Sequence, residues 1–315
     1  VYTERVTMRQ YVDIEGSGEL TTKITFTGST SWDGTSSTLL GANNAELRFL
    51  TVENTGGAAY AFAIYNSSAA PRLTHVTATA SGGTESYGVF NSSSSPTMTN
   101  VIASASGGTY SIGVQNVESS PTMTHVIASA SGGTHNMGVN NNNPCSPMMT
   151  DVTASASGGT DSYGVYNGSG SPTMTNVIAS ASGATMYNDG VFNSSSASPT
   201  MTNVTASASG GMYSYGVRNY SSSATINNSV ISASGGTNNY GIYNTTNHPE
   251  IASTVRVNNS QISGSTNTIV NDTNFTTLIG GSQLYGGPVD TSAGGTLTCA
   301  GVYDENYTFY ASTCP

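Results

Sequence analysis

Apolar and polar residues alternate along most of the chain with a period of two. Ala103 and Ala105 alternate with Ser104 and Ser106, and residues 97–99 place a methionine between two threonines. Such alternation predicts short β-strands that bury one face. Gly, Ser, Asn and Pro recur at short intervals, and no stretch places apolar residues at helical spacing. The pattern therefore predicts an all-β chain with many turns.

The alternating stretches belong to a repeat of 25 to 27 residues, which becomes visible when the glycine pairs are aligned. One apolar residue stands nine positions before each pair, and a second follows the pair. The first column consists of Leu47, Leu73, Met98, Met123, Met149, Met174, Met201 and Ile226. The second consists of Ile64, Val89, Val114, Val139, Val165, Val191, Val217, Ile242 and Ile269. Fixed offsets of this kind are typical of a solenoid.

Asparagine occupies one position of each repeat, two residues after the second apolar column. This column consists of Asn66, Asn91, Asn116, Asn141, Asn167, Asn193, Asn219, Asn244 and Asn271. A carboxamide both donates and accepts, so a buried asparagine can bond to the coils on both sides and satisfy backbone groups at a bend. We therefore predict an internal asparagine ladder. Glycosylation sequons within the ladder are discounted, which leaves Asn203, Asn258, Asn274 and Asn306 as candidate glycan sites.

The columns predict coils of about three short strands each, which pair in parallel and advance about 4.8 Å per coil. We expect about ten or eleven coils over residues 1–295. Residues 296–315 depart from the repeat and are expected to form an aromatic capping segment. Cys299 and Cys314 would close a loop there if they pair.

Two stretches resemble a known family. Residues 11–18 (YVDIEGSG), preceded by residues 1–8 (VYTERVTM), resemble the opening coils of the pectin-lyase-like right-handed parallel β-helix superfamily. The phrase SSPTMTNV at 94–101 resembles bacterial β-helix repeat proteins of unassigned activity. The resemblance implies one right-handed parallel β-helix over nearly the whole chain, and it is weak for function.

Charge and cysteine content narrow the setting. Charged residues make up 8% of the chain, and 7 Lys+Arg against 17 Asp+Glu leave a net charge of -10. This disfavours nucleic acid and anionic membranes as partners, and no apolar run predicts membrane insertion. If Cys299 and Cys314 pair, Cys145 is left over; it could be buried, free or paired between chains, and we expect an inert structural role. A disulfide, and a chain that starts at Val1 without Met, favour an exported protein, extracellular or at the cell surface, that has lost an N-terminal segment.

The resemblance also implies what an active member of the superfamily needs: clustered carboxylates, a calcium site and an Arg or Lys on one face. The carboxylates expected in the coils occupy different repeat positions, mostly in turns: Glu85, Glu118, Asp151, Asp161 and Asp189. His75 and His125 share a turn position two coils apart, about 10 Å, too far for one metal ion. Asp304 and Glu305 fit a capping role. We therefore expect no catalytic, metal or cofactor site, and no enzymatic activity.

Two kinds of outward-facing side chain, aromatic and threonine, could form a binding surface. Tyr65, Phe90, Tyr166, Phe192 and Tyr243 follow the second apolar column and form a candidate interaction face. A second tyrosine set consists of Tyr87, Tyr163, Tyr215 and Tyr240. Such rings stack on sugars or proteins, or only stabilise the rod. A threonine grid consists of Thr97/Thr99, Thr122/Thr124, Thr173/Thr175 and Thr200/Thr202 and resembles an ice-binding face, although Met148 interrupts it.

The two ends of the solenoid suggest the leading functional hypothesis. The N-terminal end lacks a capping helix, and an open end that meets a different surface on the next copy propagates into a filament. We therefore expect a non-catalytic extracellular subunit that self-associates head to tail. The alternative is a monomeric adhesin or glycan-binding rod. A polysaccharide lyase- or hydrolase-like enzyme and an ice-binding protein are further alternatives.

Overall fold

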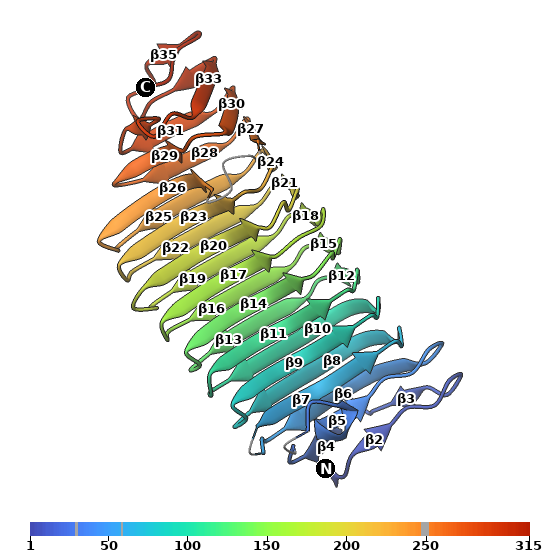
Figure 1. Cartoon of the computed structure of the whole chain (residues 1–315). Coiled ribbons are helices and arrows are strands. Elements are labelled where there is room, and N and C mark those ends of the chain that lie inside the picture. Colours follow the sequence, from blue (N-terminus) through green and yellow to red (C-terminus); the bar gives the residue numbers. More distant parts are fainter. Residues whose placement is uncertain (29–30, 58, 247–251) are drawn as a thin grey trace.

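The chain forms a single right-handed parallel β-helix of about 11 turns (Figure 1). The computed structural model describes residues 1–28, 31–57, 59–246 and 252–315. Coils stack along one axis from the N-terminal to the C-terminal end, so residues one repeat apart lie side by side. The predicted all-β solenoid of stacked parallel coils is confirmed.

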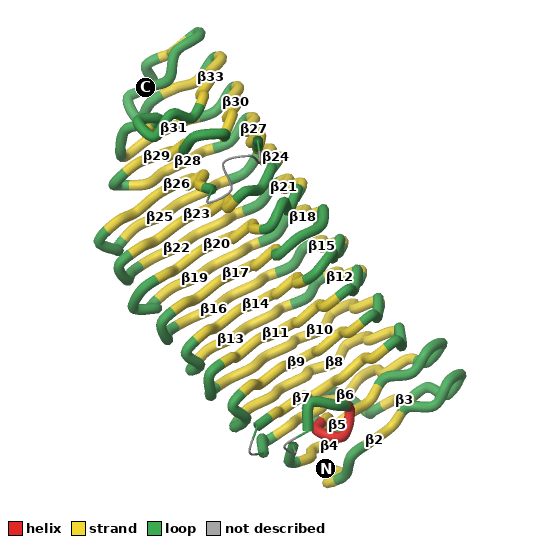
Figure 2. Tube along the Cα trace, in the orientation of Figure 1, coloured by secondary structure: helices red, strands yellow, loops and turns green. Residues whose placement is uncertain are grey.

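Strands line the long faces of the rod, and turns lie at its corners (Figure 2). Sheet I, as we name the 12-stranded sheet, consists of β2 (Val6–Thr7), β5 (Ser37–Leu40), β7 (Tyr60–Ser67), β9 (Glu85–Ser92), β11 (Tyr110–Val117), β14 (His135–Asn142), β17 (Asp161–Asn167), β20 (Tyr187–Ser194), β23 (Tyr213–Tyr220), β26 (Asn238–Thr245), β29 (Asn267–Asn271) and β32 (Val289–Asp290). Its strands all pair in parallel.

Sheet II, the 23-stranded sheet, covers the remaining faces. It consists of β1 (Tyr2–Thr3), β3 (Ile14–Glu15), β4 (Lys23–Phe26), β6 (Glu46–Asn54), β8 (Arg72–Ser81), β10 (Thr97–Ser106), β12 (Thr122–Thr124), β13 (Ile127–Ser131), β15 (Met148–Thr150), β16 (Thr153–Ser157), β18 (Thr173–Thr175), β19 (Ile178–Ser182), β21 (Thr200–Thr202), β22 (Thr205–Ser209), β24 (Thr225–Asn227), β25 (Val230–Ser234), β27 (Ser253–Asn258), β28 (Gln261–Gly264), β30 (Phe275–Gly280), β31 (Gln283–Gly286), β33 (Thr296–Ala300), β34 (Val302–Tyr303) and β35 (Phe309–Tyr310). The 3₁₀ turn η1 (Gly34–Ser36) is the helical element of the described residues, which include no helix long and apolar enough to cross a membrane.

One coil shows how the sequence produces the three predicted strands. β12 and β13 meet at His125, whose φ of 52° places the backbone in the left-handed region and turns the chain. The glycine pair then leads into β14, and Gly132 has a φ of 71°. In β8 and β10 the same bend lies within one continuous strand. The bend favours asparagine, which tolerates this conformation, and Asn100 stands there in β10.

The interior is filled by the two apolar columns and the alanines between them. Met98, Met123 and Val114 are fully buried, and the threonines beside the methionines point outward. Sheets I and II approach each other so closely at one corner that a side chain has no room there: a Cβ built on Gly138 would lie 2.6 Å from the Ser155 nitrogen. Glycine therefore precedes the valine of the second column in these coils.

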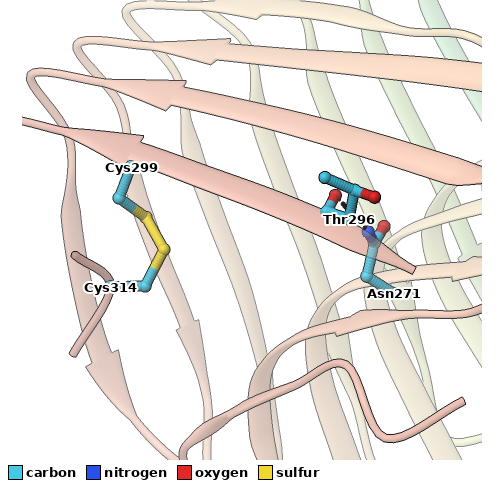
Figure 3. The surroundings of a disulfide bond; sticks show 4 residues. All are labelled: Asn271, Thr296, Cys299 and Cys314. Atoms are coloured by element: carbon cyan, nitrogen blue, oxygen red, sulfur yellow. Dashed lines mark hydrogen bonds between the residues drawn. A yellow bond between two sulfur atoms is a disulfide. The ribbon is translucent and has the colours of Figure 1, made fainter. Parts of the chain in front are cut away.

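The asparagine ladder is confirmed. Each Nδ2 donates to the Oδ1 of the next asparagine along the rod, for example from Asn141 to Asn167 and from Asn167 to Asn193, both at 2.8 Å. The bonding differs from our expectation, because the carboxamides bond mainly to one another and not to backbone groups at a bend. Asn271 ends the ladder by donating to the Thr296 carbonyl at 2.7 Å (Figure 3).

The predicted disulfide between Cys299 and Cys314 is also confirmed (Figure 3). β33 still stacks in parallel on β30, and the chain reverses only when β35 pairs antiparallel with β34. The division of the chain at residue 295 stays a prediction. Cys145 is free and fully buried, and its thiol lies 3.2 Å from both the Asn142 carbonyl and the Ser119 backbone nitrogen.

Replacing Asn167 with leucine should destabilise the rod. The change leaves the Asn141 Nδ2 and the Asn193 Oδ1 without their partners, and each unsatisfied buried group costs about 1 to 3 kcal/mol. We expect urea denaturation to show a loss of at least about 2 kcal/mol. The exposed Asn142→Leu serves as the control. Equal stability of the two variants would contradict the role of the ladder.

Removing the disulfide should loosen the C-terminal end. A cross-link closing a 15-residue loop contributes about 3 kcal/mol, so Cys299→Ala/Cys314→Ala should speed hydrogen exchange in β34 and β35 while the middle coils stay protected. Cys145→Ser, which places a serine where Ser119 stands one coil earlier, should leave exchange unchanged. Protection of β34 and β35 in the double variant would count against a stapled end.

Candidate functional site

Sheet I presents three columns of outward side chains, because its strands pair without any shift in register. The rim column consists of Tyr60, Glu85, Tyr110, His135, Asp161, Tyr187, Tyr213 and Asn238. The middle column consists of Phe62, Tyr87, Ile112, Met137, Tyr163, Asp189, Tyr215 and Tyr240. The third column consists of Tyr65, Phe90, Gln115, Asn140, Tyr166, Phe192, Arg218 and Tyr243.

An aromatic cluster, which we call the Trp32 cluster, covers the N-terminal part of this face. Trp32 packs edge-on against four rings, with centroids 4.8 Å from Tyr60 and 5.5 Å from both Phe62 and Phe90. Tyr87 also contacts Trp32 and is almost fully buried. Desolvation, together with the adjacent Glu85 carboxylate, raises the pKa of Tyr87 above its usual range, so its phenol stays protonated and donates to Glu85 Oε2 at 2.5 Å.

A second aromatic cluster begins at β17 and contains a buried ion pair. Tyr166 and Phe192 pack with ring centroids 5.1 Å apart. Arg218 lies over the Phe192 ring at 4.0 Å and pairs with Asp189 at 2.5 Å. Burial raises the pKa of Asp189 to about 6, although Arg218 acts in the opposite direction. We name this group the Arg218 cluster.

A groove of about 490 Å³ lies between the two clusters. The strands β11 and β14 form its floor, because Ile112 and Met137 replace aromatic rings in the middle column and Gln115 and Asn140 replace them in the third. Asn140 donates to Gln115 Oε1 at 2.8 Å, which ties the two floor carboxamides together. The groove thus has aromatic end walls and a floor that is half apolar and half uncharged polar.

Ionisable side chains of the rim column line one edge of the groove. His135 Nδ1 lies 2.7 Å from Asp161 Oδ2, and both side chains are largely covered. Tyr110 stacks on His135 with centroids 5.0 Å apart. A carboxylate that accepts from Nδ1 orients the ring and leaves Nε2 for a ligand, the arrangement used in acid–base catalysis.

The structure corrects our interpretation of the carboxylates. Glu118 and Asp151 do lie in left-handed turns, but Glu85 and Asp161 occupy the same rim column in two strands of sheet I. Asp189 lies in the middle column. The expectation that the carboxylates lie in turns was therefore wrong for Glu85, Asp161 and Asp189, which lie in strands. The sequence hides this because each column contains several residue types, so a shared position is visible only when the register is known.

The candidate interaction face lies on sheet I as expected, but two of its rings are not exposed. Tyr65 and Phe90 keep only 8% and 3% of their surface, because they pack in the Trp32 cluster. Tyr166, Phe192 and Tyr243 are half-buried. Tyr87 and Tyr215 of the second tyrosine set are buried as well. Their neighbours on adjacent coils cover these rings, and no single repeat reveals that.

The other sequence candidates lie elsewhere. His75 is half-exposed and His125 is exposed at the bends of sheet II, where His125 lies 3.5 Å from Asp151. Asp304 accepts from two backbone nitrogens and from the Tyr310 hydroxyl, which organises the terminal turn. The threonine grid is in register on sheet II, with Met148 between its threonines. Among the described residues, no group of three or more His, Cys, Asp and Glu side chains is placed to hold a metal ion.

Sequence reasoning missed several residues of the groove. Trp32, Tyr110 and His135 were not candidates, and Glu85 and Asp161 were dismissed. The sequence did contain a signal for these residues: the rim column corresponds to the position four residues before each valine of the second apolar column. Reading that position down the repeats would have placed Glu85, His135 and Asp161 in one line. Trp32 precedes the regular repeat and gave no such signal.

No known family model matches the chain, and no curated protein sequence matches it. Solved structures do match. The Azotobacter vinelandii mannuronan C-5 epimerase AlgE6 A-module is similar over 95% of this chain and 84% of its own, with a TM-score of 0.66 and 14% identity. The AlgE4 A-module of the same organism matches over 91% and 82%, with a TM-score of 0.61 and 14% identity.

A third similar structure is the catalytic domain of a GH87 alpha-1,3-glucanase in complex with nigerose. It matches over 95% of this chain and 61% of its own, with a TM-score of 0.51 and 12% identity. At these identities the likenesses establish the fold. The activities in these names belong to those proteins.

These likenesses correct two expectations. We expected a non-catalytic filament subunit and no enzymatic activity, and the comparisons contradict both expectations: the similar structures are modules of mannuronan C-5 epimerases and the catalytic domain of an alpha-1,3-glucanase, and none of those reported above is a filament subunit. The expectation of no site rested on ionisable groups that looked scattered in the sequence, whereas the register places Glu85, His135 and Asp161 in one column. Head-to-tail self-association stays an untested prediction.

Replacing Arg218 with methionine should destabilise the second cluster. The change leaves Asp189 buried without its cation, and breaking such a pair costs about 3 to 5 kcal/mol. Asp189 already has a folded pKa above its unfolded value of 3.8, so its contribution to stability is present at low pH and is lost as the pH rises through about 6.

Without Arg218 the pKa of Asp189 should rise further. Urea denaturation should therefore show a smaller penalty for Arg218→Met at pH 4 than at pH 7.5. The exposed Arg256→Met is the control, with an expected change within about 0.5 kcal/mol at either pH. A pH-independent penalty for Arg218→Met would contradict a buried carboxylate that resists ionisation.

Proposed function

We propose that this protein acts on a glycan, and that the groove between the Trp32 and Arg218 clusters binds a segment of the sugar chain. The observation that supports this most is a hollow with aromatic end walls and an imidazole–carboxylate pair at its edge. Aromatic rings pack against the apolar faces of sugars, while floor carboxamides hydrogen-bond to hydroxyl groups. Strands of a rigid stacked sheet hold all these side chains.

In this proposal His135 transfers the proton. Asp161 orients the ring through Nδ1 and stabilises the imidazolium, while Nε2 faces the ligand. Tyr110 stacks on the ring and restrains its rotation. The imidazole can then give a proton to a departing sugar oxygen or take one from an attacking group.

The rim does not support a hydrolase with two carboxylates. Glu85 and Asp161 occupy the same column but lie three coils apart, about 14 Å along the axis. Carboxylate pairs of glycosidases are separated by about 5 to 9.5 Å. His135 is therefore the acid–base group of the proposal, and Glu85 is a binding group.

An extracellular location is part of the same proposal. The Cys299–Cys314 disulfide supports it, because such bonds persist in oxidising compartments. A groove that opens at the surface of a rod is also accessible to a long polymer.

The proposal predicts that turnover and binding separate by mutation. With a panel of plant, fungal and bacterial polysaccharides, mass spectrometry should detect products from the unmodified protein. His135→Ala and Asp161→Asn should lower turnover about 100-fold or more, because a positioned acid–base group contributes that much. Binding in affinity electrophoresis should change little. Tyr163 lines the groove and stacks on Phe192 of the Arg218 cluster with ring centroids 5.8 Å apart, so it forms part of one end wall. Tyr163→Ala should instead weaken binding about tenfold.

A matched control is available on the other sheet. His125 also faces a carboxylate, Asp151, at 3.5 Å, but lies outside the groove. His125→Ala should retain full turnover. Turnover that survives His135→Ala, or a panel in which no glycan binds, would reject the proposed function.

A further inference from the structure

The groove has more carboxylates than cations among its lining residues, because His135 pairs with Asp161 while Glu85 has no cationic partner among them. Glu85 and Asp161 line it, and His135 is the basic side chain among the lining residues. All seven Lys and Arg residues fall in the described part of the chain, and none of them lines the groove. The whole chain has a net charge of -10, so its long-range field also repels anions.

Arg218 is the cation on this face of sheet I, and it is already engaged. Its guanidinium lies 2.5 Å from Asp189 and stacks over Phe192, which leaves 14% of the side chain exposed. Pairing with Asp189 cancels its charge toward a ligand. Recruiting it would leave Asp189 buried and unpaired, which is costly.

The remaining lining groups fit a ligand without charge. Gln115, Asn140 and Asn142 offer uncharged hydrogen-bonding groups, and Ile112 and Met137 offer apolar surface. Carboxamides exchange hydrogen bonds with sugar hydroxyls in either direction. An anionic sugar would instead place its charge near the Glu85 and Asp161 carboxylates, and like charges in contact oppose binding strongly.

We propose that the groove takes an uncharged pyranose chain and excludes carboxylated and sulfated glycans. This inference rests on the proposed function and specifies its ligand class. Discrimination arises chiefly from repulsion by Glu85 and Asp161, so it is a property of the groove and does not depend on any particular sugar linkage.

The test uses pairs of polymers that differ only in charge. Fully methyl-esterified homogalacturonan is compared with its de-esterified form, and hydroxyethyl cellulose with carboxymethyl cellulose, by affinity electrophoresis of the full chain. The uncharged member of at least one pair should bind at least tenfold more tightly at about 0.01 M salt. The difference should shrink near 1 M salt, where charges are screened.

A variant locates the discrimination. Glu85→Gln keeps the size of the side chain and removes one negative charge. It should therefore reduce the affinity ratio between the uncharged and the anionic polymer of a pair several-fold, mainly because the anionic polymer binds more tightly. Glu118→Gln is the matched control, because Glu118 is an exposed turn carboxylate outside the groove. It should leave the difference unchanged.

The outcomes separate the two proposals. If the anionic polymer of each pair binds as tightly as the uncharged one or more tightly, and Tyr163→Ala abolishes this binding, the inference about charge is wrong but the glycan groove is supported. A chitosan oligosaccharide that binds tenfold more tightly than its N-acetylated form would replace the uncharged ligand with a cationic one, which also overturns the inference. Absence of binding to every polymer, or binding unaffected by Tyr163→Ala, would reject the proposed function itself.

Discussion

In-register parallel pairing between coils is the constraint on which the whole structure depends. Each backbone strand bonds to its counterpart about 4.8 Å away, so a sequence position becomes a column that runs along the rod. The asparagine ladder reinforces this register from inside, because a carboxamide displaced by one residue would lose partners on both neighbouring coils. Within the regular coils, the surface follows from which residues fill each column, and a change in one coil mainly affects the coils next to it.

The groove is a consequence of that rule. Two of the outward columns on sheet I hold bulky aromatic rings on both sides of β11 and β14, and smaller or more flexible side chains on those two strands. The floor of the hollow therefore requires no loop excursion and shares the backbone hydrogen bonds of the rod. Trp32 closes one end from outside the regular repeat, and the Arg218–Asp189 pair fixes the aromatic cluster at the other. A site built on strands in this way is held rigid by its support.

The sequence predicted the periodic features and missed the features that occur once. The apolar columns, the Asn66-to-Asn271 ladder and the disulfide repeat or pair at readable spacings, so their burial follows from the pattern. The site depends on Glu85, His135 and Asp161, three different residue types at one position, which look unrelated until the register is applied. The burial of Tyr65 and Phe90 depends on neighbouring rings and on Trp32, whose position the repeat does not specify.

Because the chain has few charged residues, the ionisable side chains that line the groove dominate its local electrostatic potential. Only 8% of the residues are charged, and Lys23, Arg48 and Arg72 form ion pairs on sheet II, away from the groove. On sheet I the one arginine beside the groove is neutralised by Asp189, so the local potential is set by the rim column. That column combines the His135–Asp161 pair, to which we assign proton transfer in the proposed function, with an additional carboxylate, Glu85, while the floor is uncharged. The register that places His135 at the edge of the groove thus also places Glu85 and Asp161 there, so the proposed chemistry and the proposed preference for uncharged ligands arise from one column.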